Sequence, residues 1–218
     1  MKEMRSTVIK KIIEKKIIAI IRGVEEKKTL ALAEALYKGG IELIEVTFNQ
    51  RGDFPATADA IAAISRHFGG RVLAGAGTVT TPELVQMAAT AGAKYIISPN
   101  TDLAVIETTR KLGLVSIPGA LTPTEILGAH NSGADFVKVF PASNFGSGYI
   151  KALKTPLSQV KLMAVGGINQ INIREYFDAG CVGAGVGGNL VNKKWIEAGE
   201  YDKITDLAKA FLLEIGRQ

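Results

Sequence analysis

The sequence has few of the residues on which disulfides and metal sites depend. Its single cysteine, Cys181, cannot form an intramolecular disulfide, as suits a reducing cytoplasm. Its two histidines, His67 and His130, stand apart in segments of helical pattern, in neither an HExxH nor a His-x-His spacing. We therefore expect no metal site, and we expect no cofactor.

Long apolar runs and aromatic residues near the N-terminus are also lacking. The run at 17–21 is too short for the core of a signal peptide or for a membrane span, so we expect a cytoplasmic protein with no membrane partner. Lys10-Lys11 and Lys15-Lys16 alternate with apolar residues as on the solvated face of an amphipathic helix. No aromatic side chain lies among them to stack on bases, so no nucleic-acid partner is expected. The net charge of +5 suits a small anionic substrate.

Apolar runs of strand length alternate with amphipathic helical patterns along the whole chain. Such alternation predicts a parallel sheet covered by helices. The expected strands are 17–22, 43–48, 72–78, 95–100, 115–120, 136–141, 162–167 and 184–189. The expected helices are 25–38, 55–68, 82–91, 102–112, 123–132, 149–154 and 169–179, with two more near 193–198 and 201–215.

About eight strand–helix units predict an α/β protein with a (β/α)8 TIM barrel and an extra N-terminal helix, as one domain over residues 1–218. A doubly wound sheet would need a glycine-rich turn after its first strand, and Ile21-Arg22-Gly23-Val24 has none. The segment Gly183-Ala184-Gly185-Val186-Gly187-Gly188 matches GxGxxG, but no further strand follows to complete a nucleotide-binding unit. In a barrel, the chemistry is expected where the strands end.

Lys138 is the most informative residue, because it lies inside the apolar segment Phe136-Val137-Lys138-Val139-Phe140-Pro141. A lysine is rarely buried unless it is paired or functional, and burial lowers the pKa of its amine. Such an amine can form a Schiff base with a carbonyl substrate. A structural ion pair is the alternative interpretation, and the apolar neighbours favour catalysis.

Two further charged residues are expected at the same barrel mouth. Strand alternation turns Glu45 inward with Leu43 and Thr47, and Arg22 ends the first strand. Glu45 could move protons during a Schiff-base reaction, and the planar fork of Arg22 could bind a carboxylate. An ion pair between a strand-end glutamate and arginine remains open as the alternative. Thr78 adds a hydroxyl donor at the end of the third strand.

Two glycine pairs end the last two strands of the predicted barrel. Gly166 and Gly167 follow Val165, and Gly187 and Gly188 follow Val186. Backbone N–H groups of glycine-rich loops at this place commonly bind phosphate in barrels, although plain turns are the alternative. No GxSxG motif occurs, so a serine nucleophile is not indicated.

Six segments, in order, give the chain a strong resemblance to a known family over nearly its whole length. It resembles the class I aldolases of the 2-keto-3-deoxy-6-phosphogluconate and 2-keto-4-hydroxyglutarate (KDPG/KHG) aldolase family. The segments are Ile44-Glu45-Val46-Thr47, Gly75-Ala76-Gly77-Thr78, Ile97-Ser98-Pro99-Asn100, Ile117-Pro118-Gly119, Val137-Lys138-Val139-Phe140-Pro141-Ala142 and Val165-Gly166-Gly167-Ile168.

The resemblance implies a trimeric barrel enzyme that needs no metal. Its expected reaction cleaves 2-keto-3-deoxy-6-phosphogluconate to pyruvate and glyceraldehyde 3-phosphate, and many members also cleave 2-keto-4-hydroxyglutarate to pyruvate and glyoxylate. By match, Lys138 is the Schiff-base lysine and Glu45 the general acid and base. The substrate-binding residues implied are Arg22 and Thr78 for the pyruvyl carboxylate, Pro99 and Phe140 for the pocket wall, and Gly166, Gly167, Gly187 and Gly188 for phosphate.

The chain also departs from the family pattern. Asn49 stands where some members have an arginine, so Arg22 holds the carboxylate alone or Arg51 reaches back to it. Val165 replaces a threonine common before the first glycine pair, and Asn189 replaces a serine that often follows the second. The segment 144–151 resembles the branch that includes 2-keto-3-deoxy-6-phosphogalactonate aldolases, which is the alternative substrate.

Two functions of other classes are alternatives to the aldolase. A non-catalytic barrel that binds phosphorylated metabolites would keep the glycine pairs but would have no need for Lys138. A metal-dependent epimerase on the same fold would need clustered histidine ligands, which the sequence lacks.

Overall fold

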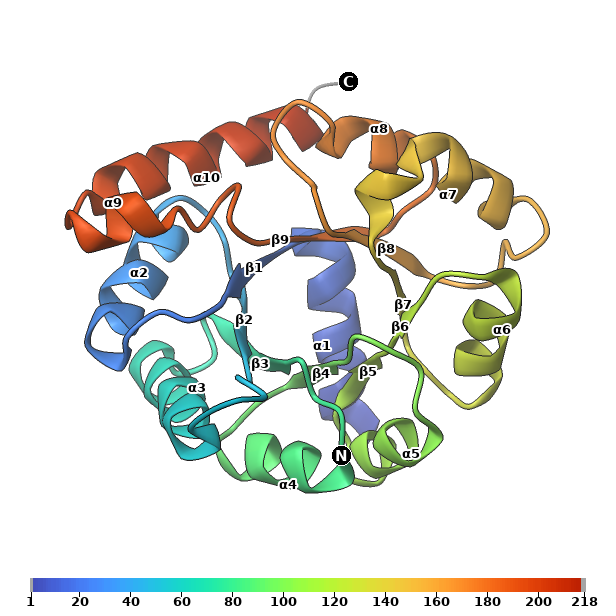
Figure 1. Cartoon of the computed structure of the whole chain (residues 1–218), viewed down its shortest axis with the longest axis horizontal. Helices are drawn as coiled ribbons and strands as arrows, with labels where there is room; N and C mark the ends of the chain where they lie inside the picture. The colour runs from blue at the N-terminus through green and yellow to red at the C-terminus, as the bar shows by residue number, and fades with distance from the viewer. Residues whose placement is uncertain (1, 217–218) are drawn as a thin grey trace.

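The structure is a computed structural model that describes residues 2–216, and its strands form a parallel barrel surrounded by helices (Figure 1). Nine strand segments lie in the order β5-β4-β3-β2-β1-β9-β8-β7-β6. Their bounds are β1 (Ile17–Ile21), β2 (Leu43–Thr47), β3 (Leu73–Gly77), β4 (Tyr95–Ile97), β5 (Val115–Ile117), β6 (Gly119–Ala120), β7 (Val137–Val139), β8 (Leu162–Val165) and β9 (Gly183–Val186).

The ring closes at Pro118, which separates β5 from β6 within one apolar run. Proline has no N–H group, so it interrupts the regular ladder there. The pairing nevertheless continues across the break: β4 pairs with β5 and β6 pairs with β7. The N–H of Phe136 donates to Ser116 O (3.3 Å), and that of Lys138 donates to Pro118 O (2.9 Å). The predicted (β/α)8 barrel is therefore confirmed, with the expected strand at 115–120 divided in two.

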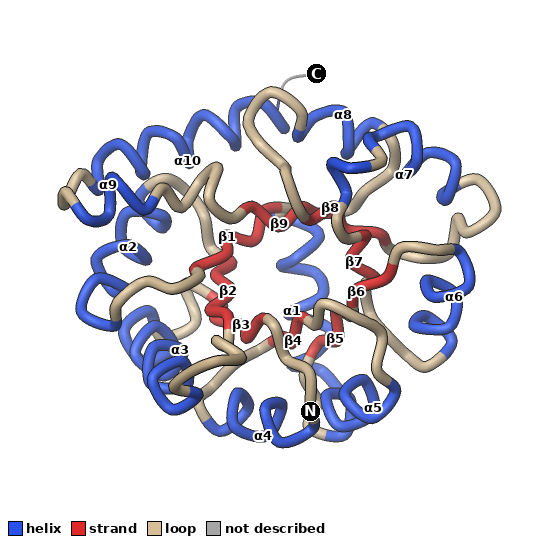
Figure 2. The backbone as a smooth tube through the Cα atoms, in the orientation of Figure 1, coloured by secondary structure: helices blue, strands red, loops and turns tan. Residues whose placement is uncertain are grey.

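Helices follow the strands and form the outer layer of the ring (Figure 2). Their bounds are α2 (Glu26–Lys38), α3 (Phe54–Phe68), α4 (Pro82–Thr90), α5 (Leu103–Lys111), α6 (Pro123–Asn131), α7 (Gly146–Lys154), α8 (Ile173–Asp178), α9 (Lys193–Glu197) and α10 (Tyr201–Gly216), with a 3-10 turn, η1 (Ala142–Asn144). None of the helices between residues 2 and 216 has the length and apolar character needed to cross a membrane.

Helix α8 begins later than the helix predicted over residues 169–179. The Asn169 side chain accepts hydrogen bonds from the N–H groups of Ile171 (2.8 Å) and Asn172 (3.0 Å), which makes a local turn. Asparagine commonly competes with helix in this way, so α8 begins at Ile173.

The predicted N-terminal helix, α1 (Lys2–Lys15), closes one end of the barrel. Val8 and Ile12 are buried in one cluster with interior residues such as Ile18, Leu43 and Phe136. Since α1 precedes β1, this end carries the amino ends of the strands. In Figure 2 the helix is visible through the opening of the ring. The reaction site must therefore open at the opposite, carboxyl end.

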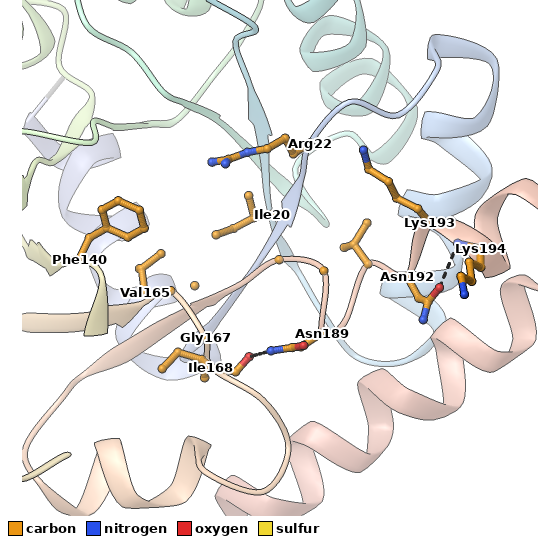
Figure 3. Close-up of a pocket in the computed structure, with 15 residues that line it drawn as sticks. Ile20, Arg22, Phe140, Val165, Gly167, Ile168, Asn189, Asn192, Lys193 and Lys194 are labelled. Carbon is orange, nitrogen blue, oxygen red and sulfur yellow. Dashed lines mark hydrogen bonds between the residues drawn. The ribbon is translucent and has the colours of Figure 1, made fainter. Parts of the chain in front are cut away.

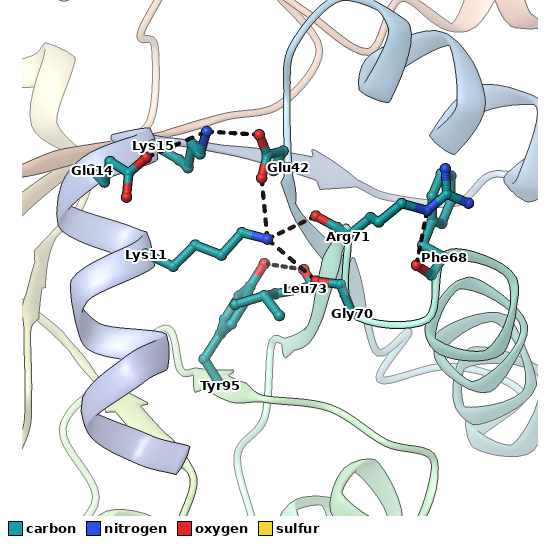
Figure 4. Close-up of polar contacts among 9 residues, drawn as sticks. All are labelled: Lys11, Glu14, Lys15, Glu42, Phe68, Gly70, Arg71, Leu73 and Tyr95. Atoms are coloured by element: carbon teal, nitrogen blue, oxygen red, sulfur yellow. Dashed lines mark hydrogen bonds and ion pairs between the residues drawn. The ribbon is translucent and has the colours of Figure 1, made fainter. Parts of the chain in front are cut away.

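Ion pairs tie α1 to the loops around this closed end (Figure 4). Lys11 Nζ lies 3.1 Å from Glu42 Oε2 and donates to Arg71 O (2.7 Å), while Lys15 Nζ lies 2.7 Å from Glu42 Oε1. Arg5 forms a two-point contact with Asp135, at 2.6 and 3.1 Å. Part of the basic face predicted to be solvated is thus used to hold the helix in place.

Candidate active site

Lys138 and Glu45 both point into the barrel, as strand alternation predicts. Only 7% of Lys138 and 3% of Glu45 is exposed. Their neighbours Val137, Val139 and Val46 belong to the separate core between strands and helices. An amine and a carboxyl group therefore lie inside the barrel among apolar side chains.

Glycines on the neighbouring strand β3 make room for the Glu45 side chain. Gly75 and Gly77 pair in register with Glu45 and Thr47. A methyl group on Gly77 would overlap the Glu45 carboxyl group, and one on Gly75 would overlap the ring of Tyr95. Tyr95 is fully buried beneath this site and donates its hydroxyl to Leu73 O (3.3 Å). The glycine pattern of β3 thus sets the position of the carboxyl group.

Burial controls the charge of both groups. It raises the pKa of Glu45 from 4.5 to about 7, although the charges of Lys138 and Arg22 act in the opposite direction. It lowers the pKa of Lys138, an effect that Glu45 opposes and Arg22 increases. The three groups therefore influence one another electrostatically. Among the ion pairs within 4.0 Å in residues 2–216, none joins Lys138 to Glu45, or Arg22 to either.

A cavity of about 630 Å³ opens at the carboxyl ends of β1, β8 and β9 (Figure 3). Its lining brings together Arg22, Phe140 and both glycine pairs from the sequence prediction. Lys138 does not line it, but its Nζ lies 4.9 Å from the centre of the ring of Phe140, which does. The lysine amine is therefore close to a side chain of the cavity wall.

The first glycine pair has a backbone conformation that other residues seldom adopt. Gly166 and Gly167 have φ angles of 97° and 72°. A methyl group on Gly167 would overlap Ser143, whereas nothing lies within 4 Å of the position that one would take on Gly188. The glycines leave backbone open to the cavity, as binding of a phosphate requires.

Thr78 and Pro99 follow β3 and β4, on another part of the mouth, and do not line this cavity. Thr78 has a left-handed backbone (φ 57°), and its carbonyl accepts a hydrogen bond from Gln50 Nε2 (2.9 Å). Pro99 is exposed. The proposed contacts of these two residues with a pyruvyl group therefore stay predictions.

Several lining residues were not among the predicted substrate-binding residues, although Asn189 was noted as a departure from the family pattern. They are Ile20, Ile168, Gly185, Asn189, Val191, Asn192, Lys193 and Lys194. The signal that could have identified the two lysines is their place: they follow the last strand at its carboxyl end, where barrel enzymes bind substrate. Elsewhere, no three histidine, cysteine or acidic side chains of residues 2–216 gather in a way that could hold a metal.

The comparisons of the sequence with known proteins give aldolases. The family model for KDPG and KHG aldolases matches residues 8–207. A 2-dehydro-3-deoxy-6-phosphogalactonate aldolase of Escherichia coli K12 is 39% identical over 175 residues, or 80% of this chain and 83% of that protein. A 2-dehydro-3-deoxy-phosphogluconate aldolase of Treponema pallidum is 35% identical over 92% of this chain and 94% of that protein.

Solved structures give the same result. One described as "Native KDPGal structure" superposes with a TM-score of 0.83 at 36% identity, covering 91% of this chain and 93% of that one. A KDPG aldolase from Legionella pneumophila, with pyruvate captured as a covalent carbinolamine intermediate, has a TM-score of 0.82 at 32% identity and covers 90% and 93%.

Proposed function

Because this chain belongs to the KDPG and KHG aldolase family and is a carbon–carbon lyase, we propose that it cleaves a 2-keto-3-deoxy-6-phospho sugar acid through a Schiff base on Lys138. The products are pyruvate and glyceraldehyde 3-phosphate. One observation carries the mechanism: Lys138 is a nearly unexposed amine with a lowered pKa, and its Nζ lies 4.9 Å from the centre of the Phe140 ring, in the wall of a cavity that both glycine pairs line. The pyruvate carbinolamine described for the Legionella relative supports the same chemistry.

The proposed steps use the two buried groups. The Lys138 amine adds to the C2 carbonyl, and loss of water gives an iminium ion. Glu45 accepts the proton of the C4 hydroxyl while the C3–C4 bond breaks, and the bonding electrons pass to the iminium nitrogen as an enamine. Protonation at C3 and hydrolysis then release pyruvate and restore the amine.

The substrate's two anionic ends require separate partners. Arg22 directly follows β1 and lines the cavity, so its guanidinium is assigned to the carboxylate. Backbone N–H groups of Gly166, Gly167, Gly187 and Gly188 are assigned to the phosphate. The resemblance further assigns Thr78 to the carboxylate and Pro99 and Phe140 to the pyruvyl wall. A homotrimer and a cytoplasmic location stay predictions of the same resemblance.

The geometry also supports a choice between two substrates that differ only in configuration at C4. Val165 is 8% exposed and lines the cavity immediately before Gly166. It offers no hydroxyl to a C4 oxygen, unlike the threonine common at this position in the family. Both this residue and the similarity to the galactonate-type relatives favour the galactonate-derived acid over the gluconate-derived one.

An assay of pyruvate release, coupled to lactate dehydrogenase, tests both the proposed function and the preference between the two C4 epimers. We expect kcat/KM to be about tenfold higher for the galactonate-derived than for the gluconate-derived acid, as the loss of one polar contact would give. Val165→Thr should reduce that ratio. 2-Keto-4-hydroxyglutarate serves as an unphosphorylated third substrate. No release from any of the three would contradict the proposed activity, and a preference for the gluconate-derived acid would reverse the choice.

Gly77→Ala should lower both stability and turnover, because its methyl group would displace the Glu45 carboxyl group. We expect the free energy of unfolding to fall by roughly 1–3 kcal/mol, as at other overpacked sites. Pyruvate release should be at least about tenfold slower. Gly148→Ala on α7 is the control, because nothing lies within 4 Å of its added methyl group. Urea unfolding and the coupled assay measure the two effects. Wild-type turnover in Gly77→Ala would show that the position of Glu45 is unimportant.

A further inference from the structure

The Gln50 side chain joins two loops at the barrel mouth. Its Nε2 donates to Thr78 O (2.9 Å), and its Oε1 accepts a hydrogen bond from the Thr80 hydroxyl (3.2 Å). Gln50 lies in the loop after β2, and the two threonines lie in the loop after β3, the neighbouring strand. Both ends of the amide of an exposed residue are thus used to hold the second loop. The reaction steps above give this residue no task.

The backbone that carries Gln50 is itself fixed by a tight turn. The Asn49 carbonyl accepts a hydrogen bond from the N–H of Gly52 (3.0 Å), and Asn49 Oδ1 accepts one from the N–H of Arg51 (3.1 Å). Asparagine side chains commonly stabilise turns in this way. Because Gln50 is one of the two central residues of the turn, its amide starts from a defined place.

Thr78 has a left-handed backbone with a φ of 57°, which is rare for a residue branched at Cβ. Such a conformation persists only where surrounding contacts hold it. The carbonyl before it accepts from the Phe48 N–H (2.9 Å), and the N–H after it donates to Ile97 O (3.2 Å). Its own carbonyl accepts from Gln50. Since the first two contacts are made by backbone groups, Gln50 provides the side-chain contact that a substitution can remove.

Thr78 also lies next to one of the groups that react. Although it does not line the cavity described above, it follows Gly77, where an added methyl group would overlap the Glu45 carboxyl group. The substrate carboxylate is attached to the carbon that bonds to Lys138, so its partners must lie close to the two buried groups. Within residues 2–216 the Thr78 hydroxyl makes no hydrogen bond, so it is free to donate to a carboxylate.

We propose that Gln50 is a positioning residue for substrate binding: by holding the left-handed backbone of Thr78, it keeps the Thr78 hydroxyl in place for the pyruvyl carboxylate. Without this contact the strained residue can relax to an extended backbone, and its hydroxyl then changes direction. Arg22 supplies charge to the carboxylate, whereas Gln50 acts only through Thr78. This proposal rests on the proposed function, since it concerns the carboxylate of the same substrate.

Reduction with borohydride at a series of pyruvate concentrations measures the contact. Gln50→Met keeps the length of the side chain but removes both of its hydrogen bonds. We expect the pyruvate concentration that half-saturates trapping on Lys138 to rise about tenfold, as loss of one hydrogen bond to a charged group gives. The trapping rate at saturating pyruvate should change less than about twofold, because the reacting groups are untouched. Gln86→Met, an equal change at an exposed position of α4, should leave both quantities as in the wild type.

A double substitution separates a positioning role from a general structural one. Glycine adopts a left-handed backbone without strain, so Thr78→Gly needs no help from Gln50. Thr78→Gly should itself raise the half-saturating pyruvate concentration about tenfold, and adding Gln50→Met should raise it less than about twofold further. If the two single effects multiply instead, Gln50 does not act through Thr78 and the proposal is wrong.

The outcomes separate this proposal from the function on which it rests. If trapping on Lys138 is normal in the wild type and the half-saturating concentration is unchanged in Gln50→Met, only the role of Gln50 is overturned. If the wild type is not trapped at all, the proposed function is overturned too. Thermal unfolding checks the fold of Gln50→Met. If that variant unfolds, Thr80→Val replaces it, with a rise of about threefold as support and no rise as refutation.

Discussion

Lys138→Met should lose pyruvate release by at least ~10⁴-fold, the largest effect expected of any single substitution in this protein. Methionine has nearly the same length and suits a buried site, but it has no amine to add to a carbonyl. Because the substitution also removes a poorly solvated charge, the fold should be retained. Thermal unfolding monitored by circular dichroism checks that the loss of activity does not result from loss of the fold.

Borohydride reduction in the presence of pyruvate gives the direct measurement. In the wild type, the adduct should map to the peptide that contains Lys138, and Lys138→Met should give none. Lys161→Met is a control, since that lysine is exposed just before β8. An adduct on any other lysine would place the nucleophile elsewhere.

Glu45→Gln should slow turnover by about 10²–10⁴-fold, the usual contribution of a general acid or base. Glutamine keeps the shape that fits over Gly77 but cannot accept the proton of the C4 hydroxyl. Single-turnover measurements should show slower cleavage as well as slower capture of pyruvate. Turnover equal to that of the wild type would remove Glu45 from the reaction.

The pH profile gives Glu45 a second test. With a pKa of about 7, the group is about half ionised in the free enzyme near neutral pH. Since cleavage needs the carboxylate, kcat/KM should rise with pH through a midpoint near 7, and this rise should be missing from Glu45→Gln. A midpoint near 4.5 would mean that burial does not control this carboxyl group.

The same pKa makes stability depend on pH in a definite direction. Below about 4.5 the carboxyl group is protonated in both the folded and the unfolded chain. Between about 4.5 and 7 it ionises readily only in the unfolded chain, so its contribution to stability falls as pH rises through this window and is constant above it. Urea unfolding at several pH values should show this fall in the wild type and a smaller one in Glu45→Gln.

The chemistry of the barrel interior could be predicted from the sequence because strands have a strict two-residue period. Once Phe136 and Leu43 are assigned to the interior, Lys138 and Glu45 must face it too. Arg22 and the glycine pairs were placed at the mouth for a similarly local reason, since each directly follows a strand. The family resemblance then supplied the roles that spacing alone leaves open.

Other features depend on contacts between distant parts of the chain. The basic face of residues 8–16 looked solvated, yet Lys11 and Lys15 share Glu42, and Arg5 contacts Asp135, which is 130 positions away. A helix was predicted near 193–198, but nothing in that segment indicates that Lys193 lines the same cavity as Arg22, which depends on how β9 lies beside β1. No pattern within one segment contains that information.

The helix α1 has a consequence for the order in which products leave. Since Val8 and Ile12 fill one end of the barrel, we expect substrates and products to pass through the mouth at the other end. In the proposed reaction, the three-carbon unit is held covalently on the buried Lys138, whereas the aldehyde is free once the bond breaks. We therefore expect the aldehyde to depart first and pyruvate last, so that the reverse synthesis begins with pyruvate and is ordered.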